Sequence, residues 1–145
     1  MHRLVERCRT GDHPGCVARL AAGWVVFGER QVFPGYCLLL PDPVVPHLNA
    51  LTHTDRSRFL AAMAQVGDAL LAVTGATRIN YAMFGNQEPA LHAHLFPRRD
   101  DEPEATRAWQ PWAFDWTAVP AYSETLHGEL RRRLAATLHG GASLA

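Results

Sequence analysis

Lysine is absent from this chain of 145 residues, and all 14 of its basic residues are arginine. The chain has 14 acidic residues as well, so its formal net charge at neutral pH is zero. Proteins that bind nucleic acid or membrane surfaces mainly by electrostatic attraction carry excess positive charge, so zero net charge argues against both classes. A local pocket for a small phosphorylated ligand remains compatible with this balance.

The chain also has few cysteines and no long apolar run. Three cysteines are an odd number without a disulfide framework, which favours a reduced, cytoplasmic protein. The longest apolar run lies around Tyr36–Leu40, far short of the roughly 20 residues that a membrane-spanning helix needs. Residues 1–7 contain no apolar stretch of the kind found in a secretory signal. We therefore expect a cytoplasmic protein without a membrane segment.

Hydrophobic residues make up 48% of the chain and charged residues 19%, a composition typical of a globular protein that buries its own core. We expect a single domain over residues 1–145, with residues 1–16 as a loose N-terminal segment. Cys8, His13 and Cys16 in this segment suggest zinc as an alternative. Their spacing lacks a Cys-x2-Cys pair and a clear fourth ligand, so we predict free thiols, no metal site and no cofactor.

Hydrophobic patterning predicts a protein with both strands and helices. β-prone runs and alternating apolar positions predict strands at residues 17–20, 24–28, 36–40, 78–84 and 90–96. The clearest helix is Thr54–Thr74, with Thr54 as N-cap, a glycine directly after it and apolar residues at spacings of three and four. A last helix is expected after Ser123, which can cap it. Strands in the first half and middle, with two helices outside the sheet, indicate an α+β fold.

A pair of histidines carries most of the information about function. Because alternate residues of a strand share one face, His92 and His94 are expected to point the same way. Two imidazoles on one face need polar partners, and a metal, a phosphate or a reacting group would satisfy them. The spacing alone leaves catalysis, metal ligation and a structural pair open.

Other polar side chains surround this pair in the sequence. Asn86 and Gln87 come just before the strand, Asn80 lies on the neighbouring strand, and Arg98 stands at the far end. Amide and guanidinium groups donate hydrogen bonds to phosphate oxygens, so this set suits a phosphate group. Arg98 has an alternative use, because acidic residues that follow it offer ion-pair partners.

The segment Gly85–Arg98 resembles the active-site segment of the histidine triad family, whose signature is three histidines alternating with apolar residues, often followed by Pro-Arg. Pro34–Pro41 resembles the family's entry strand, and His47–Leu51 before the long helix also fits. The likeness covers roughly residues 17–116. The Asp-Asp pair and the tryptophan-rich stretch that follow are similar to the bacterial branch often labelled diadenosine tetraphosphate hydrolase-like.

The resemblance implies a HIT-like α+β fold, with an antiparallel sheet of about five strands, one long central helix and a C-terminal helix. It also implies a nucleotide or another phosphorylated small molecule as ligand, and a symmetric homodimer. Family members hydrolyse or transfer nucleoside monophosphates. The middle histidine attacks the α-phosphorus, a nucleotidyl-imidazole forms, and water or another acceptor resolves it.

Alignment on the Pro-Arg pair carries these roles onto individual residues of this chain. His92 takes the place of the nucleophile and His94 that of the third histidine. Asn80, Asn86 and Gln87 fall where amide or hydroxyl side chains hold the ribose and phosphates. The resemblance therefore implies a nucleotide hydrolase or nucleotidyl transferase that acts on a nucleoside phosphoramidate or dinucleoside polyphosphate.

Two positions depart from the family pattern. Ala90 replaces the first histidine of the triad, and Val44 stands where relatives commonly carry another histidine. Alanine keeps the main-chain carbonyl that holds Nδ1–H of the nucleophile, so Nε2 of His92 remains free to attack. Three hypotheses follow: a hydrolase or transferase with weakened or altered activity, a non-catalytic nucleotide-binding module, and a pathway-specific enzyme that reuses the two-histidine pocket on another substrate.

Three tryptophans lie in the irregular stretch at residues 99–121, at positions 109, 112 and 116. Their indole rings offer stacking surfaces for a nucleobase. We expect instead that they hold the irregular stretch against the body of the protein or against a partner subunit.

Overall fold

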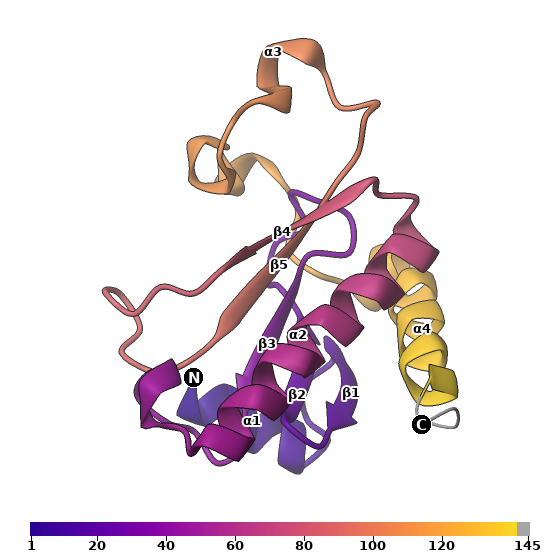
Figure 1. The fold of residues 1–145 in the computed structure, drawn as a ribbon. Coiled ribbons are helices and arrows are strands. Elements are labelled where there is room, and N and C mark those ends of the chain that lie inside the picture. Colours follow the sequence, from indigo (N-terminus) through magenta and orange to yellow (C-terminus); the bar gives the residue numbers. More distant parts are fainter. Residues whose placement is uncertain (142–145) are drawn as a thin grey trace.

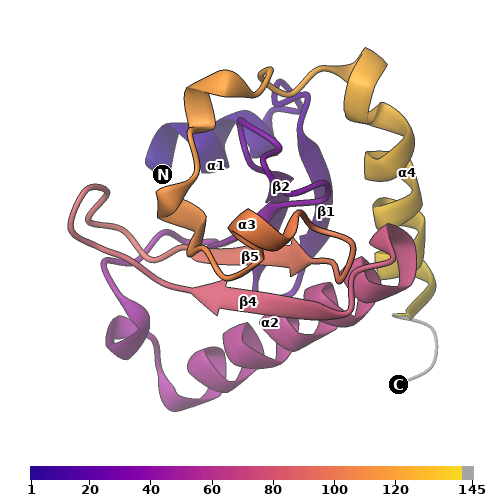
Figure 2. The same ribbon diagram turned by 90° about the horizontal axis from the view of Figure 1, so that it is seen from above.

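The computed structural model describes residues 1–141, and its strands form one antiparallel sheet (Figure 1 and Figure 2). The strands are β1 (Cys16–Leu20), β2 (Gly23–Phe27), β3 (Cys37–Pro41), β4 (Arg78–Ala82) and β5 (Ala93–Arg98). Their order across the sheet is β1-β2-β3-β5-β4, so β5 lies inside the sheet and β4 forms an edge. The predicted α+β fold with an antiparallel five-stranded sheet is confirmed.

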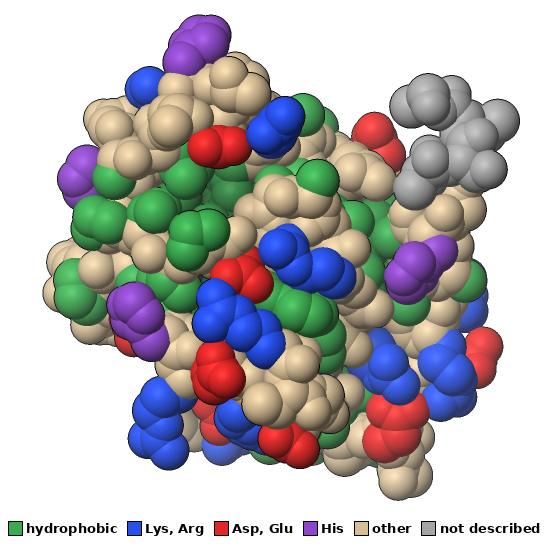
Figure 3. All heavy atoms as spheres, turned by 90° about the horizontal axis from the view of Figure 1, so that it is seen from below, with side chains coloured by type: hydrophobic (Ala, Val, Ile, Leu, Met, Phe, Trp, Pro, Cys, Tyr) green, Lys and Arg blue, Asp and Glu red, His purple; other side chains and the backbone are tan. Residues whose placement is uncertain are grey.

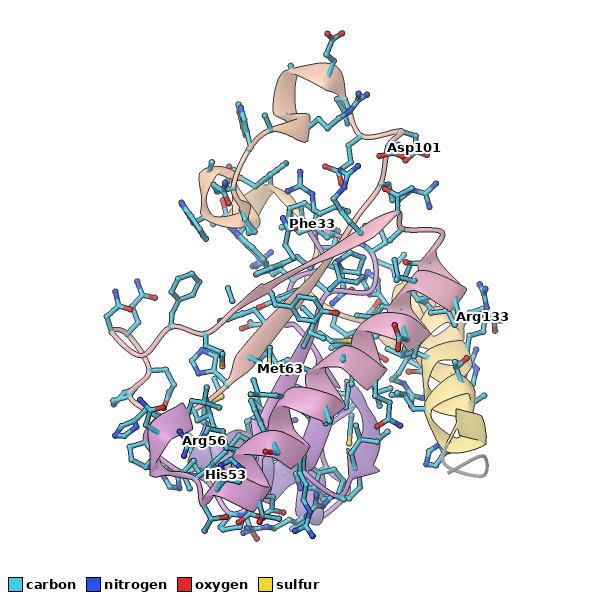
Figure 4. The ribbon with its side chains drawn as sticks, viewed as in Figure 1. Phe33, His53, Arg56, Met63, Asp101 and Arg133 are labelled. Atoms are coloured by element: carbon cyan, nitrogen blue, oxygen red, sulfur yellow. The ribbon has the colours of Figure 1, made fainter. Side chains whose placement is uncertain are left out.

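Two helices cover one face of this sheet (Figure 2). They are the long helix α2 (His53–Thr74) and the C-terminal helix α4 (Glu124–Gly141), which also pack against each other. Alternate strand residues such as Leu39 and Leu95 are buried beneath them in one core. In Figure 4, Met63 of α2 lies between the helix and the sheet, in the same core. The predicted central and C-terminal helices are therefore both present.

The opposite face is partly covered by α1 (His2–Arg9), so the prediction of a loose segment over residues 1–16 is wrong. Val5 and Cys8 of this helix are buried at 1% and 4% exposure, in a second core that contains Leu38 of β3. The helix is short for an isolated chain, and burial of these two side chains stabilises it. An apolar pair three residues apart is too brief a pattern to predict a helix from sequence.

The free cysteines and the mixed surface charges match the composition of the chain, which has few cysteines and zero net charge. Cys37 is fully buried in the core as a free thiol. Within residues 1–141, Cys8, His13 and Cys16 do not come together in a group of three or more possible metal ligands. No helix in this range is long and apolar enough to cross a membrane. On the face shown in Figure 3, arginines and acidic side chains are interspersed.

The ends of the main helices follow the expected capping chemistry, with one shift. The N-cap of α2 is Thr52 rather than Thr54, and its hydroxyl oxygen accepts a hydrogen bond from the Asp55 backbone N–H at 3.1 Å. At the other end, Gly75 adopts a φ of 69°, a left-handed conformation that glycine adopts without strain. Ser123 caps α4 as predicted, with its hydroxyl 3.3 Å from a backbone N–H three residues later.

The strand that carries the histidines begins later than predicted. Residues 90–92 precede β5, because their backbone groups bond outside the sheet. The Ala90 N–H donates to the Glu88 carbonyl at 2.8 Å, and the Leu91 N–H donates to the Val45 carbonyl at 2.7 Å. At the other end, β5 continues through Pro97 and Arg98 rather than ending at residue 96. His92 therefore lies in the turn that enters β5, and His94 lies on the strand itself.

Residues after β5 form a separate lobe at one end of the sheet, drawn in orange in Figure 1. The lobe contains α3 (Glu104–Arg107) and two 3-10 turns, η2 (Pro111–Ala113) and η3 (Trp116–Ala118). A further 3-10 turn, η1 (Leu48–Ala50), precedes α2. In Figure 4, Phe33 lies between the lobe and the sheet. The predicted irregular stretch is thus a compact structure that packs on the face opposite α2.

Candidate active site

A cavity of about 470 Å³ opens beside the entry to β5, between the sheet and the lobe. The turn after β4 and the lobe contribute to its walls, together with the residue before β3 and the two histidines. Its lining residues are Tyr36, Phe84, Asn86, Gln87, Glu88, His92, His94, Phe96, Pro111, Trp112 and Trp116. Both histidines and two of the predicted amide side chains therefore meet in one cavity.

His92 is buried at 6% exposure and is held by the turn in which it lies. Its Nδ1 lies 2.8 Å from the main-chain carbonyl oxygen of Ala90. A carbonyl only accepts hydrogen bonds, so Nδ1 carries the proton and Nε2 carries the lone pair. Within the described residues, Nε2 has no hydrogen-bond partner and is not among the buried unpartnered atoms, so it is open to solvent in the cavity. The carbonyl of Ala90 thus has the position predicted from the sequence.

His94 lies on β5 with its ring centroid 4.8 Å from that of His92. Its Nδ1 is 2.7 Å from the Tyr36 hydroxyl oxygen, and its ring is nearly parallel to those of Tyr36 and Phe96. Burial, together with the neighbouring His92, lowers the pKa of His94 to about 4. The ring of His94 is therefore uncharged at neutral pH.

Five of the eleven residues that line the cavity are Phe, Tyr or Trp. Trp116 is held in place, because its indole N–H donates to the Pro111 carbonyl at 2.9 Å and its ring meets Tyr36 edge-on at 5.3 Å. Trp112 is 63% exposed and meets Phe84 edge-on at 5.6 Å. Trp116 therefore anchors the lobe as expected, while Trp112 offers an accessible ring at the cavity mouth.

Asn80, a predicted substrate-binding residue, does not line this cavity. In the β4–β5 register it pairs with Phe96, whereas Ala82 pairs with His94. Asn80 lines an adjacent hollow with Gln110 and other residues of the lobe. Phe96 borders both spaces.

Arg98, the other predicted phosphate ligand, is also absent from the cavity. It is buried at 5% exposure, and its guanidinium donates to the Glu102 carboxylate at 2.7–3.1 Å. It also donates to the carbonyls of Arg107 and Trp109, at 2.8 and 3.0 Å, and lies over the Phe33 ring at 4.9 Å. The prediction is corrected: this guanidinium holds the lobe to the sheet and has no free edge for a phosphate.

Several cavity residues were not indicated by the sequence. Tyr36 was expected only as part of a buried strand, yet its hydroxyl reaches His94 across the sheet. The signal for it is the register: Leu38 of β3 pairs with His94, and Tyr36 shares the face of Leu38 two residues away. Phe84 and Glu88 line the cavity from the turn after β4, and no periodic pattern marks residues in a turn.

Comparisons with known proteins agree with this fold. The chain is similar in structure to a histidine triad (HIT) protein from Sinorhizobium meliloti 1021, with a TM-score of 0.74 and 21% identity over 94% of this chain and 95% of that one. A histidine triad protein from Marinobacter aquaeolei VT8 gives a TM-score of 0.74 and 20% identity, over 97% and 98% of the two chains. A hypothetical histidine triad nucleotide-binding protein from Sulfolobus tokodaii strain7 gives 0.74 and 10%, over 95% and 92%.

At these identities the likeness to solved structures establishes the fold alone. No curated protein sequence matches the chain. The HIT domain model matches residues 26–101, which include both cavity histidines and more than half of the sequence. The chain therefore belongs to the HIT domain family.

Proposed function

We propose that this protein is a nucleotide hydrolase or nucleotidyl transferase that works through a nucleotidyl-histidine intermediate on His92. The observation that carries the proposal is the 2.8 Å contact between Nδ1 of His92 and the carbonyl of Ala90. It places the lone pair on Nε2, at the atom that opens into the cavity. An activated nitrogen of this kind is what covalent catalysis at phosphorus requires. Membership of the HIT domain family, whose proteins generally bind nucleotides, supports a nucleotide as the substrate.

The chemistry balances in two steps for a nucleoside phosphoramidate. In the first step, Nε2 of His92 bonds to phosphorus and the phosphorus–nitrogen bond breaks. The leaving nitrogen keeps the bonding electron pair and takes a proton from water. In the second step, the hydroxide that remains bonds to phosphorus, and the electron pair of the phosphorus–Nε2 bond returns to His92. The products are a nucleoside monophosphate and a free amine, and another acceptor in place of water gives transfer.

The intermediate places positive charge on the imidazole ring, and the turn that holds His92 suits it. Nδ1–H donates to a fixed carbonyl dipole, which stabilises the charged ring without accepting its proton. Asn86 and Gln87 bring amide groups to the cavity for phosphate and ribose oxygens. The aromatic rings of Phe84 and Trp112 offer stacking surfaces for a base.

The charges of the cavity favour one of the two substrate classes. Among the described residues no arginine lines the cavity, Glu88 is the one charged residue in its wall, and Arg98 is occupied by the lobe. A dinucleoside polyphosphate carries several negative charges, whereas a nucleoside phosphoramidate carries one. Because unpaired charge is costly to bring into an apolar cavity, we propose phosphoramidates as the better substrates.

A non-catalytic nucleotide-binding module is the second candidate, and Ala90 is the observation that favours it. A methyl group at this position supplies no donor to the transition state, and loss of one such donor typically slows a reaction by about 10²–10³-fold. A cavity that binds a nucleotide without turning it over would have the same lining residues.

Pre-steady-state kinetics with a fluorogenic adenosine phosphoramidate separates the two candidates. The proposed enzyme releases a burst of one equivalent of amine per chain, and mass spectrometry detects one nucleotidyl group on the protein. His92→Ala is expected to abolish both while the fold and nucleotide binding remain, because no other group replaces the attacking nitrogen. His53→Ala is the matched control, because His53 is an exposed residue at the start of α2 (Figure 4). Full activity of His92→Ala would refute the covalent route, and binding without a burst in the unmodified protein would favour the binding module.

A further inference from the structure

The hydroxyl of Tyr36 occupies a defined place in the hydrogen-bond network of the cavity. Its oxygen lies 2.7 Å from Nδ1 of His94, and the two rings are parallel to within 5°. Phe96 stacks on Tyr36 with a centroid separation of 4.7 Å, and Tyr36 belongs to the second core, which also contains Phe33 and Leu38. The 2.7 Å separation is that of a hydrogen bond between the phenol oxygen and the imidazole nitrogen. Phe96 stacks on both rings, so the hydrogen bond joins two side chains with little freedom to move.

The direction of this hydrogen bond follows from the surroundings of Tyr36. Among the described residues the hydroxyl has no partner other than His94. If Nδ1 of His94 carried the proton and donated it, the phenol O–H would be left without an acceptor among these residues. Burial also raises the pKa of Tyr36, so the phenol keeps its proton at neutral pH. Tyr36 therefore donates to Nδ1, and the proton of the neutral His94 ring resides on Nε2.

The two cavity histidines consequently have opposite tautomers. In His92, Nδ1 carries the proton and donates it to the Ala90 carbonyl. In His94, Nδ1 accepts a hydrogen bond from Tyr36, so Nε2 carries the proton. Neither Nε2 atom has a partner among the described residues, and neither belongs to the buried unpartnered atoms. One ring thus presents a lone pair to the cavity, and its neighbour presents an N–H donor.

We propose that Tyr36 is a positioning residue that keeps His94 as a neutral Nε2–H donor to the phosphoryl oxygens during attack by His92. This inference rests on the proposed function, because the phosphoryl group is the partner that the donor would meet. The N–H stays on His94 throughout, and no proton is transferred. Charge that develops on a phosphoryl oxygen strengthens the hydrogen bond, so the interaction contributes more in the transition state than in the ground state.

Removal of the hydroxyl alone tests this role. Tyr36→Phe keeps the aromatic stack but frees the His94 ring to exchange tautomers, so part of the population presents a lone pair to the phosphate. We expect kcat to fall at least tenfold for an adenosine phosphoramidate, with AMP affinity nearly unchanged. Tyr122→Phe is the matched control, because the Tyr122 hydroxyl is hydrogen-bonded at 2.8 Å to Glu124, outside the cavity.

Nitrogen-15 NMR of the imidazoles gives a readout that a merely structural role would not change. At neutral pH we expect His94 to be protonated on Nε2 and His92 on Nδ1, and Tyr36→Phe to move only the His94 signals toward averaged values. A proton on Nδ1 of His94, or unchanged His94 signals and kcat in Tyr36→Phe, would overturn the proposal. Opposite tautomers without turnover by the unmodified protein would support the tautomer assignment and count against the proposed function alone.

Discussion

Acidification to pH 5 is expected to destabilise the folded protein through His94. Burial and the neighbouring His92 lower the pKa of His94 from its ordinary value of 6.5 to about 4. The unfolded chain therefore binds a proton at pH 5 where the folded chain does not. A proton taken up only by the unfolded state favours unfolding, so stability is lost as pH falls from about 6.5 to about 4.

The size of the effect follows from the two pKa values. The linkage relation gives about 2 kcal/mol between pH 7 and pH 5 for a fully buried group. His94 is partly exposed, so solvent screening reduces this to about 1–2 kcal/mol. Paired carboxylates such as Asp42 and Glu102 have lowered pKa values, caused mainly by Arg9 and Arg98 respectively, and they lose their contribution at lower pH, below about 4. The change in stability between pH 7 and pH 5 therefore reports on histidines rather than on carboxylates.

Urea denaturation at pH 7 and pH 5 measures the loss in the unmodified protein and in His94→Asn. We expect the variant to lose about 1–2 kcal/mol less between the two pH values. His13→Asn is a useful comparison, because burial, and secondarily Arg7, also lowers the pKa of His13, which lies outside the cavity. The same pH dependence in His94→Asn and the unmodified protein would show that His94 is not held neutral by the fold.

Four other outcomes are expected. Arg98→Ala should lower the free energy of unfolding by about 3–5 kcal/mol in urea denaturation, because it leaves the half-buried Glu102 carboxylate unpaired; a change below 1 kcal/mol would contradict its anchoring role. Millimolar AMP or GMP should shift the NMR amide signals of Asn86 and Gln87, and unshifted signals would exclude a nucleotide site there. Ala90→His should raise phosphoramidate turnover if the site is a weakened hydrolase, whereas a fall would indicate adaptation to another substrate. We also propose a homodimer, because β4 is an edge strand and α2 has exposed leucines that a second copy would cover. Light scattering should give twice the mass of the chain, and the mass of a single chain would exclude the homodimer.

Local chemistry explains what could be predicted from sequence. The long helix has its apolar positions, its acidic first turn and its terminal glycine within one segment, so its extent is predictable to within two residues. The same holds for His92, because its partner carbonyl at Ala90 is only two positions away. Interactions of this kind depend on neighbouring residues and need no knowledge of the fold.

Tertiary contacts decided the remaining features. Arg98 has both a phosphate and an acidic neighbour as reasonable partners in the sequence, and only the folded lobe shows that the carbonyls of Arg107 and Trp109 complete its hydrogen bonds. Asn80 lies four residues before Phe84, which lines the cavity, and the register with β5 places Asn80 opposite Phe96 instead of beside the histidines. The partners of these side chains depend on which strands pair and in what register. Local patterns in a single sequence do not determine that pairing.

The unequal exposure of the two cavity tryptophans has a consequence for the thermodynamics of binding. Trp116 is already ordered by its hydrogen bond and its neighbours, so a ligand that contacts it causes little further loss of conformational entropy. Trp112 is mostly exposed, and a ligand that covers it buries apolar surface and restricts its rotamers. Burial of that ring gives a negative heat-capacity change on binding, which makes the binding enthalpy temperature-dependent. Trp112→Ala should therefore make the heat-capacity change of binding less negative, as measured by titration calorimetry at several temperatures.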